Sequence, residues 1–144
     1  RKRLGAIVFA DAERRKRLEA ITHPAIRQRQ ARILSVLEEE AFEGVVIWDV
    51  ALLFETGGDA AMDKIVVAFA DEATELGRLM ARDGIGEADA RARIRSQMPV
   101  AEKAKRAHYV IDNSGTRATT QAQVRQVHRA LENDRATLLA KASA

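Results

Sequence analysis

The fold is decided by the stretch Val45-Val46-Ile47-Trp48-Asp49-Val50-Ala51-Leu52-Leu53-Phe54-Glu55. Its first residues are evenly apolar and rich in β-branched types, which predicts a short strand that is buried on both faces in a parallel sheet. Asp49 adds a polar group near the carboxyl end of this strand, where open α/β sheets bind their ligands. The apolar, acidic segment that follows, up to Gly57-Gly58, is therefore expected to form a wall of a substrate pocket.

Two further apolar runs have the length of strands. They are Ile65 to Ala70 and Tyr109 to Asp112, and the second leads into Asn113-Ser114-Gly115, which is typical of a turn. Two buried strands with a loop and a short helix between them, at residues 45–50 and 65–70, predict a right-handed parallel crossover. The fold class that follows is α/β, with a parallel sheet flanked by helices.

The helices before the central stretch are predicted from caps and apolar spacing. Asp11 is a good N-cap for a helix that runs to about Thr22. His23-Pro24 is expected to interrupt it, because proline is tolerated in a first helical turn but not in a helix interior, so a new amphipathic helix should begin at Pro24. Further along the chain, Asp71 is predicted to cap a helix that carries Arg78 and Arg82 on one side.

The segment from Asp83 to Ala107 is strongly charged and poor in large apolar side chains. It predicts two short helices, from Glu87 to about Gln97 and from Pro99 to about Ala107. Because few buried contacts give low local stability, we interpret the segment as a mobile lid. A long helix with valine and leucine at helical spacing is expected to end the chain.

Composition restricts the class of protein. The chain has 144 residues, which favours one domain, and 24 basic against 21 acidic residues. It has no cysteine, so disulfides and thiolate metal sites are excluded, and this favours the cytoplasm. With one Trp and one Tyr, it lacks the aromatic platforms on which single-stranded nucleic acid stacks. No apolar run approaches the roughly 20 residues that span a bilayer. We therefore expect a phosphate-bearing small molecule as partner, rather than nucleic acid or a membrane.

The segment Leu-Leu-Phe-Glu after the central strand resembles the dephospho-coenzyme A kinases, a P-loop kinase family. Four further stretches agree in order and approximate spacing: Phe9 to Ile26, Arg78-Leu79-Met80-Ala81-Arg82-Asp83, Arg93-Ile94-Arg95-Ser96-Gln97 followed by Glu102-Lys103, and Ile111-Asp112-Asn113-Ser114-Gly115. The resemblance implies transfer of the γ-phosphate of ATP, with Mg²⁺, to the ribose 3′-hydroxyl of dephospho-coenzyme A, the last step of coenzyme A biosynthesis. It also implies a P-loop kinase-like fold, with a helical acceptor-binding region at 1–43, a core at 44–82 and 108–144, and a lid at 83–107.

The chain departs from the family pattern at two places. Ala51 stands where many members carry proline, which mainly stiffens the loop there. More seriously, the motif G-x-x-x-x-G-K-[ST] and the aspartate that takes the substrate proton are not among these residues, and both would lie upstream of Arg1. We therefore expect an N-terminally truncated fragment, without the first βαβ part of the fold and inactive alone.

The resemblance also assigns roles to individual residues. Arg78 matches the catalytic arginine at the transferring phosphate, and a guanidinium suits the charge on phosphoryl oxygens. The ATP-binding residues are expected to be Arg82, Asn113, Ser114 and Gly115. The acceptor-binding residues are expected to be His23, Leu52, Leu53 and Glu55. No metal ligand is assigned, because the apolar run that ends in Asp49 is a short and common pattern.

Other interpretations of these residues stay open. Arg82 is equally expected to pair with Asp83 or Asp89, and Asn113 to Gly115 also suit an ordinary turn between strand and helix. Two other functions fit the sequence as well. One is a related small-molecule P-loop kinase with a different acceptor, and the other is a non-catalytic domain that binds nucleotides or a partner.

Overall fold

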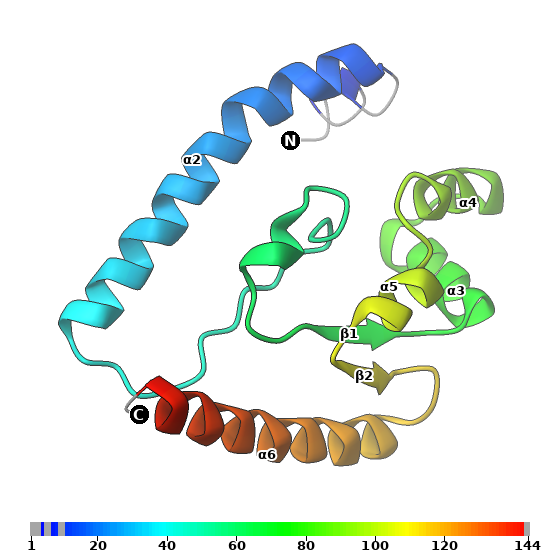
Figure 1. Ribbon diagram of the computed structural model, residues 1–144. Coiled ribbons are helices and arrows are strands. Elements are labelled where there is room, and N and C mark those ends of the chain that lie inside the picture. Colours follow the sequence, from blue (N-terminus) through cyan, green and yellow to red (C-terminus); the bar gives the residue numbers. More distant parts are fainter. Residues whose placement is uncertain (1–3, 5–6, 9–10, 143–144) are drawn as a thin grey trace. The chain divides into compact units, whose positions relative to one another are not determined.

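A computed structural model describes residues 4, 7–8 and 11–142 of the chain. The chain divides into two compact units between residues 44 and 45 (Figure 1). Leu4 and Val8, four positions apart, predict a helix over residues 1–9, most of which falls outside the described residues. In the described part, no helix is both long and apolar enough to cross a membrane.

The first unit consists mainly of one long helix, α2 (Ala12–Glu39). The side chain of Asp11 caps it by accepting hydrogen bonds from the backbone N–H groups of Glu13 (2.9 Å) and Arg14 (3.1 Å), as predicted. The predicted break at His23-Pro24 is wrong, because Pro24 lies inside the helix. Proline costs a helix interior about 3 kcal/mol, and long runs of good helix formers on both sides offset this cost.

The second unit contains a two-stranded parallel sheet of β1 (Val66–Phe69) and β2 (Tyr109–Asp112), with Val66 opposite Tyr109. Both strands were predicted from their apolar runs. The chain passes from one to the other through three helices, α3 (Glu72–Asp83), α4 (Glu87–Arg95) and α5 (Val100–Arg106). The last helix, α6 (Arg117–Ala142), follows β2 and packs against it.

The stretch Val45 to Val50, predicted to be the central strand, forms no strand. Ile47 is 79% exposed, whereas the prediction buried it. A strand needs a neighbour for its backbone hydrogen bonds, and among the described residues no segment pairs with this one. The crossover predicted between residues 45–50 and 65–70 is therefore wrong too. Turns over Ala51 to Gly57 and a short 3-10 helix, η1 (Gly58–Ala61), follow instead.

The apolar core of the second unit lies between α5 and β1. Phe54, Ile65 and Val67 are buried there, each less than a tenth exposed. Half-buried side chains from the turn, from the end of η1, and from α5 and its flanking residues surround this cluster: Leu53, Met62, Met98, Val100, Ala104 and Ala107. Figure 1 shows α5 beside β1, which agrees with their packing. The turn at residues 51–57 is thus attached to the sheet through Leu53 and Phe54.

The start of the sheet is held by a histidine side chain. The backbone N–H of Ile65 donates to Nδ1 of His108 (3.0 Å). In return, the N–H groups of His108 and Tyr109 donate to the carbonyl oxygen of Ile65, at 2.9 and 3.1 Å. Because Nδ1 accepts a hydrogen bond, the imidazole carries a proton on Nε2.

The helix α3 has a cap at each end. The side chain of Asp71 accepts a hydrogen bond from the backbone N–H of Thr74 (2.8 Å), as predicted. At the other end Gly84 adopts a left-handed conformation with φ of 63°, and its N–H donates to the carbonyl oxygen of Met80. Glycine is favoured at this position because it has no Cβ.

Candidate functional site

The carboxyl ends of β1 and β2 form one polar edge. The N–H of Asn113 donates to the carbonyl oxygen of Phe69 (2.7 Å), which extends the sheet by one hydrogen bond. The N–H of Asp71 donates to Oγ of Ser114 (2.9 Å). These bonds fasten the turn Asn113 to Gly115 to the segment that enters α3, at the edge where parallel sheets bind ligands.

Arg78 reaches this edge from α3. Its Nη1 donates to the carbonyl oxygen of Asn113 at 2.8 Å. Arg78 is exposed, and no ion pair with a carboxylate forms for it among the described residues. The structure therefore brings together Arg78 and Asn113, two residues that the sequence predicted to serve the phosphate and the nucleotide.

Two carboxylates lie at the same edge. A hydrogen bond from the backbone N–H of Thr74 holds the pKa of Asp71 below its ordinary value. The N–H of Ser114 donates to Asp112 (2.8 Å) and likewise lowers the pKa of that carboxyl, which the negative charge of Asp71 opposes. Both groups are thus anionic near neutral pH. A ligand that binds beside these two carboxylates would have to carry a positive charge, or the positive charge of Arg78 would have to offset theirs.

Arg82 lies one turn beyond Arg78 but makes different contacts. Its Nε donates to Asp83 at 2.8 Å, and Nη1 of Arg93 lies 2.6 Å from the same carboxylate. The hydrogen bond from Arg82 lowers the pKa of Asp83. This geometry is the alternative that the sequence left open, in which Arg82 pairs with Asp83 of its own helix. Arg93, through the same carboxylate, joins α4 to α3.

The residues predicted for the acceptor have different surroundings. Leu52 is half-buried, and its carbonyl oxygen accepts from both the N–H (3.1 Å) and Oγ1 (2.8 Å) of Thr56. Leu53 packs against the core cluster. His23 is half-buried on α2 in the first unit, so the structure does not relate it to the two leucines.

Glu55 belongs to a cluster with α5. Its Oε1 lies 2.8 Å from Nζ of Lys103 and accepts a hydrogen bond from the N–H of Met98 (2.9 Å). Lys103 also donates to the carbonyl oxygen of Ala51 (2.8 Å). Burial raises the pKa of Glu55, but the hydrogen bonds from Lys103 and Met98 outweigh it and leave the pKa below its ordinary value.

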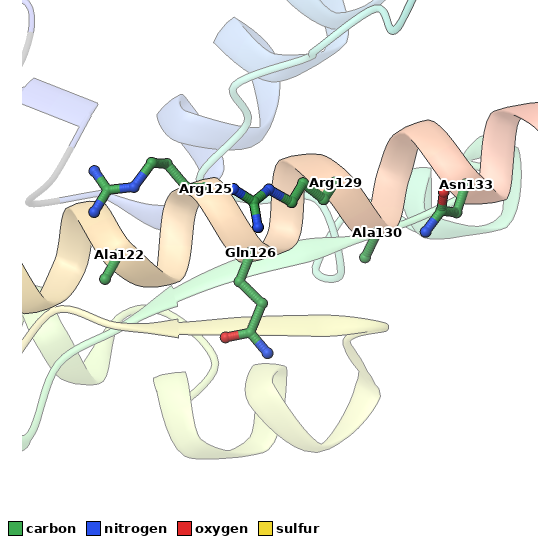
Figure 2. Close-up of a pocket in the computed structure, with 6 residues that line it drawn as sticks. All are labelled: Ala122, Arg125, Gln126, Arg129, Ala130 and Asn133. Carbon is green, nitrogen blue, oxygen red and sulfur yellow. The ribbon is translucent and has the colours of Figure 1, made fainter.

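Two hollows lie elsewhere on the second unit, each of about 460 Å³. One runs along α6 and is shown in Figure 2, where Gln126 points away from Arg125 and Arg129. The other lies between α3 and α4. It is lined by Glu72, Ala73, Leu76, Gly77, Met80 and Arg91. Neither hollow contains a residue that the sequence predicted for the site.

Comparison with known proteins decides the family. A family model described as dephospho-CoA kinase matches residues 1–119, more than four-fifths of the chain. The chain belongs to the dephospho-CoA kinase family. The match ends within α6, so most of that helix lies beyond the part that the family model describes.

Named relatives agree with the family. The chain is 48% identical over 124 residues to a dephospho-CoA kinase of Geobacillus kaustophilus, covering 86% of this chain and 61% of that protein. It is 42% identical over 127 residues to one of Geobacter sulfurreducens, covering 88% of this chain and 64% of that protein. The chain thus spans about three-fifths of the length of these relatives.

Solved structures agree with the fold. A crystal structure of a Thermus thermophilus protein has a TM-score of 0.72 at 34% identity, covering 90% of this chain and 66% of that one. A dephospho-CoA kinase from Campylobacter jejuni has a TM-score of 0.58 at 30% identity, covering 90% and 65%. The α/β, P-loop kinase-like fold that the family resemblance implied is confirmed.

The contact between α5 and the turn at residues 51–57 was not predicted from the sequence. Lys103 was grouped with the charged side chains of a lid, and its partner Glu55 lies 48 positions earlier in the chain. The one available signal was the occurrence of Glu102-Lys103 in a stretch that resembles the family. It does not reveal which carboxylate the lysine meets.

Among the described residues, no three His, Asp or Glu side chains gather in a way that could hold a metal ion. The Mg²⁺ that the family resemblance implies does not fit a ready-made site here. In P-loop kinases the metal is held in part by the Ser or Thr of the phosphate-binding loop, and that motif is not among these 144 residues.

Proposed function

We propose that this chain is part of a dephospho-CoA kinase, which transfers the γ-phosphate of ATP to the 3′-hydroxyl of dephospho-CoA. The observation that carries the proposal is the family match over residues 1–119. It is supported by the meeting of Arg78 with Asn113 at the carboxyl edge of the sheet, since the two residues are 35 positions apart. ATP and dephospho-CoA are the proposed substrates, and the cytoplasm is the proposed location.

Arg78 is the proposed catalytic residue at the transferring phosphate. Phosphoryl transfer passes through a loose transition state whose charge is spread over the phosphoryl oxygens, and a guanidinium can hold two of them. Nη1 of Arg78 donates a hydrogen bond to the carbonyl oxygen of Asn113 (2.8 Å), which fixes the direction of the arginine side chain. Its remaining N–H groups are the ones that we propose for the phosphate.

The turn Asn113 to Gly115 is proposed to contact the nucleotide of ATP. Its connections to the sheet and to Asp71 hold it at the carboxyl edge, so its exposed backbone groups have a fixed direction before ATP binds. Arg82 is proposed to bind the phosphates of ATP. To do so, its guanidinium would leave the carboxylate of Asp83 and pair with a phosphoryl group instead. Its side chain is 74% exposed, which leaves it room to turn.

His23, Leu52, Leu53 and Glu55 are the proposed acceptor-binding residues. Leu53 and Glu55 already have partners in the core and on α5, so we propose that they act by shaping the pocket. For the lid, we propose that residues 84–97, which include α4, provide the moving part. The half-buried apolar residues of α5 pack against the core.

We also propose that transfer requires residues outside these 144. A phosphate-binding loop supplies backbone amides, a lysine and a hydroxyl for the metal, and no such motif occurs in this sequence. Mg²⁺ is the proposed companion of ATP.

The test begins with the coding sequence upstream of Arg1. We expect it to encode a strand, G-x-x-x-x-G-K-[ST] and a helix, followed by a second strand that ends in Asp. The protein that includes this region should convert ATP and dephospho-CoA to ADP and CoA. The 144-residue chain alone should not.

Variants and other acceptors sharpen this test. Arg78→Met should lower kcat by at least about a hundredfold, the range of a lost electrostatic contact in the transition state. Arg125→Met, an exposed arginine on α6 beyond the family match, is the control and should leave kcat unchanged. Clear preference for a nucleoside or nucleotide as acceptor would replace this proposal with a related small-molecule kinase. Tight ligand binding without any transfer would support a non-catalytic domain instead.

A further inference from the structure

The side chain of Lys103 contacts both ends of the segment Ala51 to Glu55. Nζ of Lys103 lies 2.8 Å from the carbonyl oxygen of Ala51 and 2.8 Å from Oε1 of Glu55. Leu52, Leu53 and Phe54 lie between these two points. A single ammonium group, with three donors in one position, therefore closes this segment into a loop.

A second contact from α5 supports the same turn. The guanidinium of Arg106 lies 4.4 Å from the centre of the Phe54 ring and 2.6 Å from Oδ2 of Asp59. Stacking of a guanidinium on an aromatic ring and pairing with a carboxylate both favour one fixed arrangement. The turn is thus held on α5 at several points beyond its own backbone hydrogen bonds.

Lys103 differs from the other lysine of α5 in its burial. Its side chain is 11% exposed, whereas that of Lys105 is 70% exposed and pairs with Glu102 one turn back on the same helix. A lysine that loses its water must be compensated by well-placed acceptors. Here the acceptors are supplied by the turn, which indicates that Lys103 serves the position of the turn and not the solubility of the helix.

The turn depends on this support because its neighbours provide little. The stretch before it, residues 45–50, has no strand partner among the described residues. At the end of the turn, Gly57 adopts a left-handed conformation with φ of 69°. Besides the hydrogen bonds of the turn itself, in which Thr56 and Gly58 donate to the carbonyl oxygens of Leu52 and Leu53, the two leucines are held by the core contact of Leu53 and by the two hydrogen bonds of Lys103.

We propose that Lys103 is a positioning residue for the acceptor, which it serves by holding Leu52 and Leu53 in their binding arrangement without touching the substrate itself. This inference rests on the proposed function, in which the two leucines line the acceptor pocket. It gives α5 a fixed role in the acceptor side of the reaction. Closure over ATP is left to α4.

The test uses the transfer-competent protein described above and measures kcat and both KM values. Lys103→Met removes the ammonium and keeps much of the apolar stem. We expect its KM for dephospho-CoA to rise about tenfold while the KM for ATP changes less than about twofold, because a displaced binding segment affects only the substrate that it contacts. Lys105→Met, on the exposed side of the same helix, is the control and should change neither value.

Hydrogen exchange in the same proteins tests the position of the turn without any substrate. The amides of residues 53–58 should exchange about tenfold faster in Lys103→Met than in the wild type, because opening of the turn no longer breaks the contacts of the lysine. Exchange should be unchanged in Lys105→Met. A purely global loss of stability would instead accelerate exchange in the sheet by the same factor, which would contradict a local role for the lysine.

A second variant covers the case in which Lys103→Met fails to fold. Glu55→Gln keeps an oxygen for the lysine and for Met98 but removes the charge, so its effects should have the same direction and a smaller size. If the wild-type protein binds and phosphorylates dephospho-CoA while both variants keep its KM and its exchange rates, this inference is wrong and the proposed function stands. If the wild type does not use dephospho-CoA at all, the proposed function fails and the inference fails with it.

Discussion

The helices α4 and α5 come from one charged segment, residues 83–107, yet they are attached to the molecule in different ways. The apolar residues of α5, Val100 and Ala104, face the buried cluster beside β1. Two ion pairs connect α4 with α3, with Arg91 at 2.8 Å from Glu72 and Arg93 at 2.6 Å from Asp83. Ion pairs between exposed side chains stabilise little.

The comparison shows that charge composition alone does not distinguish a helix that packs on the apolar core from one that is attached by ion pairs. Both helices are rich in charged residues, but in α5 small apolar residues recur at helical spacing and find a partner surface in Phe54 and Val67. In α4, Ala90 is the one fully buried residue among the described positions of that helix. Four predictions test whether the core contact and the ion pairs differ in strength as this comparison requires.

Removing the ring that receives α5 should have the largest effect. Phe54→Ala should lower the free energy of unfolding of the second unit by about 3 kcal/mol, because it leaves a cavity in the cluster and removes the ring under Arg106. Urea unfolding followed by circular dichroism measures the change. Val124→Ala, on a side chain of α6 that is 46% exposed, should cost less than about 0.5 kcal/mol. Equal losses in the two variants would contradict the buried position of Phe54.

The connection between α3 and α4 should be sensitive to its backbone. Gly84 has φ of 63°, and a Cβ added there would meet no atom within 4 Å, so the cost of Gly84→Ala is conformational, about 1 to 2 kcal/mol. Gly77, inside α3, also has open space but no left-handed φ, so Gly77→Ala should stabilise by about 0.5 kcal/mol. Thermal unfolding compares the two. If both substitutions changed the stability in the same direction, α4 would be detaching from α3 instead of straining the backbone at residue 84.

The ion pair of α5 should appear in the pH dependence of stability. Because the folded state lowers the pKa of Glu55, the pair stabilises the fold above the ordinary glutamate pKa of about 4.3. This contribution is lost as the pH falls through the lower, folded-state value. Glu55→Gln should reduce the free energy of unfolding at pH 7 by about 1 kcal/mol. The variant should also lose less stability than the wild type as the pH falls from about 6 to about 3. An unchanged acid profile would show that the pair contributes nothing.

The ion pairs of α4 should give the smallest effect. Arg93→Ala removes a contact of 2.6 Å to Asp83, but the arginine side chain is 46% exposed, so the loss should stay below about 0.5 kcal/mol. It should shrink further in about 0.5 M NaCl, because salt screens exposed charges. Arg95→Ala is the matched control on the same helix. A loss above about 1 kcal/mol, independent of salt, would place α4 among the fixed parts of the unit.

Features set by neighbouring residues were predicted from the sequence. The caps at Asp11 and Asp71 and the strands around Val67 and Val110 depend on side chains within a few positions or on a plain apolar run. Residues 45–50 have the same apolar pattern, but a strand also needs a partner, which the pattern cannot supply. The unbroken α2 shows the opposite case, in which a long run of helix formers overrides the local signal of Pro24.

The candidate site was predicted only where the family resemblance marked it. The hydrogen bond from Arg78 to Asn113 joins two marked residues, but its geometry depends on the parallel pairing of β1 with β2. The pairing of Lys103 with Glu55 had no comparable signal, because many carboxylates were available to each lysine. Long-range pairs of this kind become visible only when the fold brings α5 onto the turn.

The imidazole of His108 has a consequence for the alignment of the two strands. Its Nδ1 takes the place that a peptide carbonyl would have in a longer strand, so the ladder gains one rung made by a side chain. If β2 slid by one residue, this rung would be lost and every side chain of the strand would turn to the opposite face. The imidazole ring therefore fixes the register of the two strands. It marks the one alignment in which Val67 faces α5 and the polar turn after Asp112 stands beside Asp71.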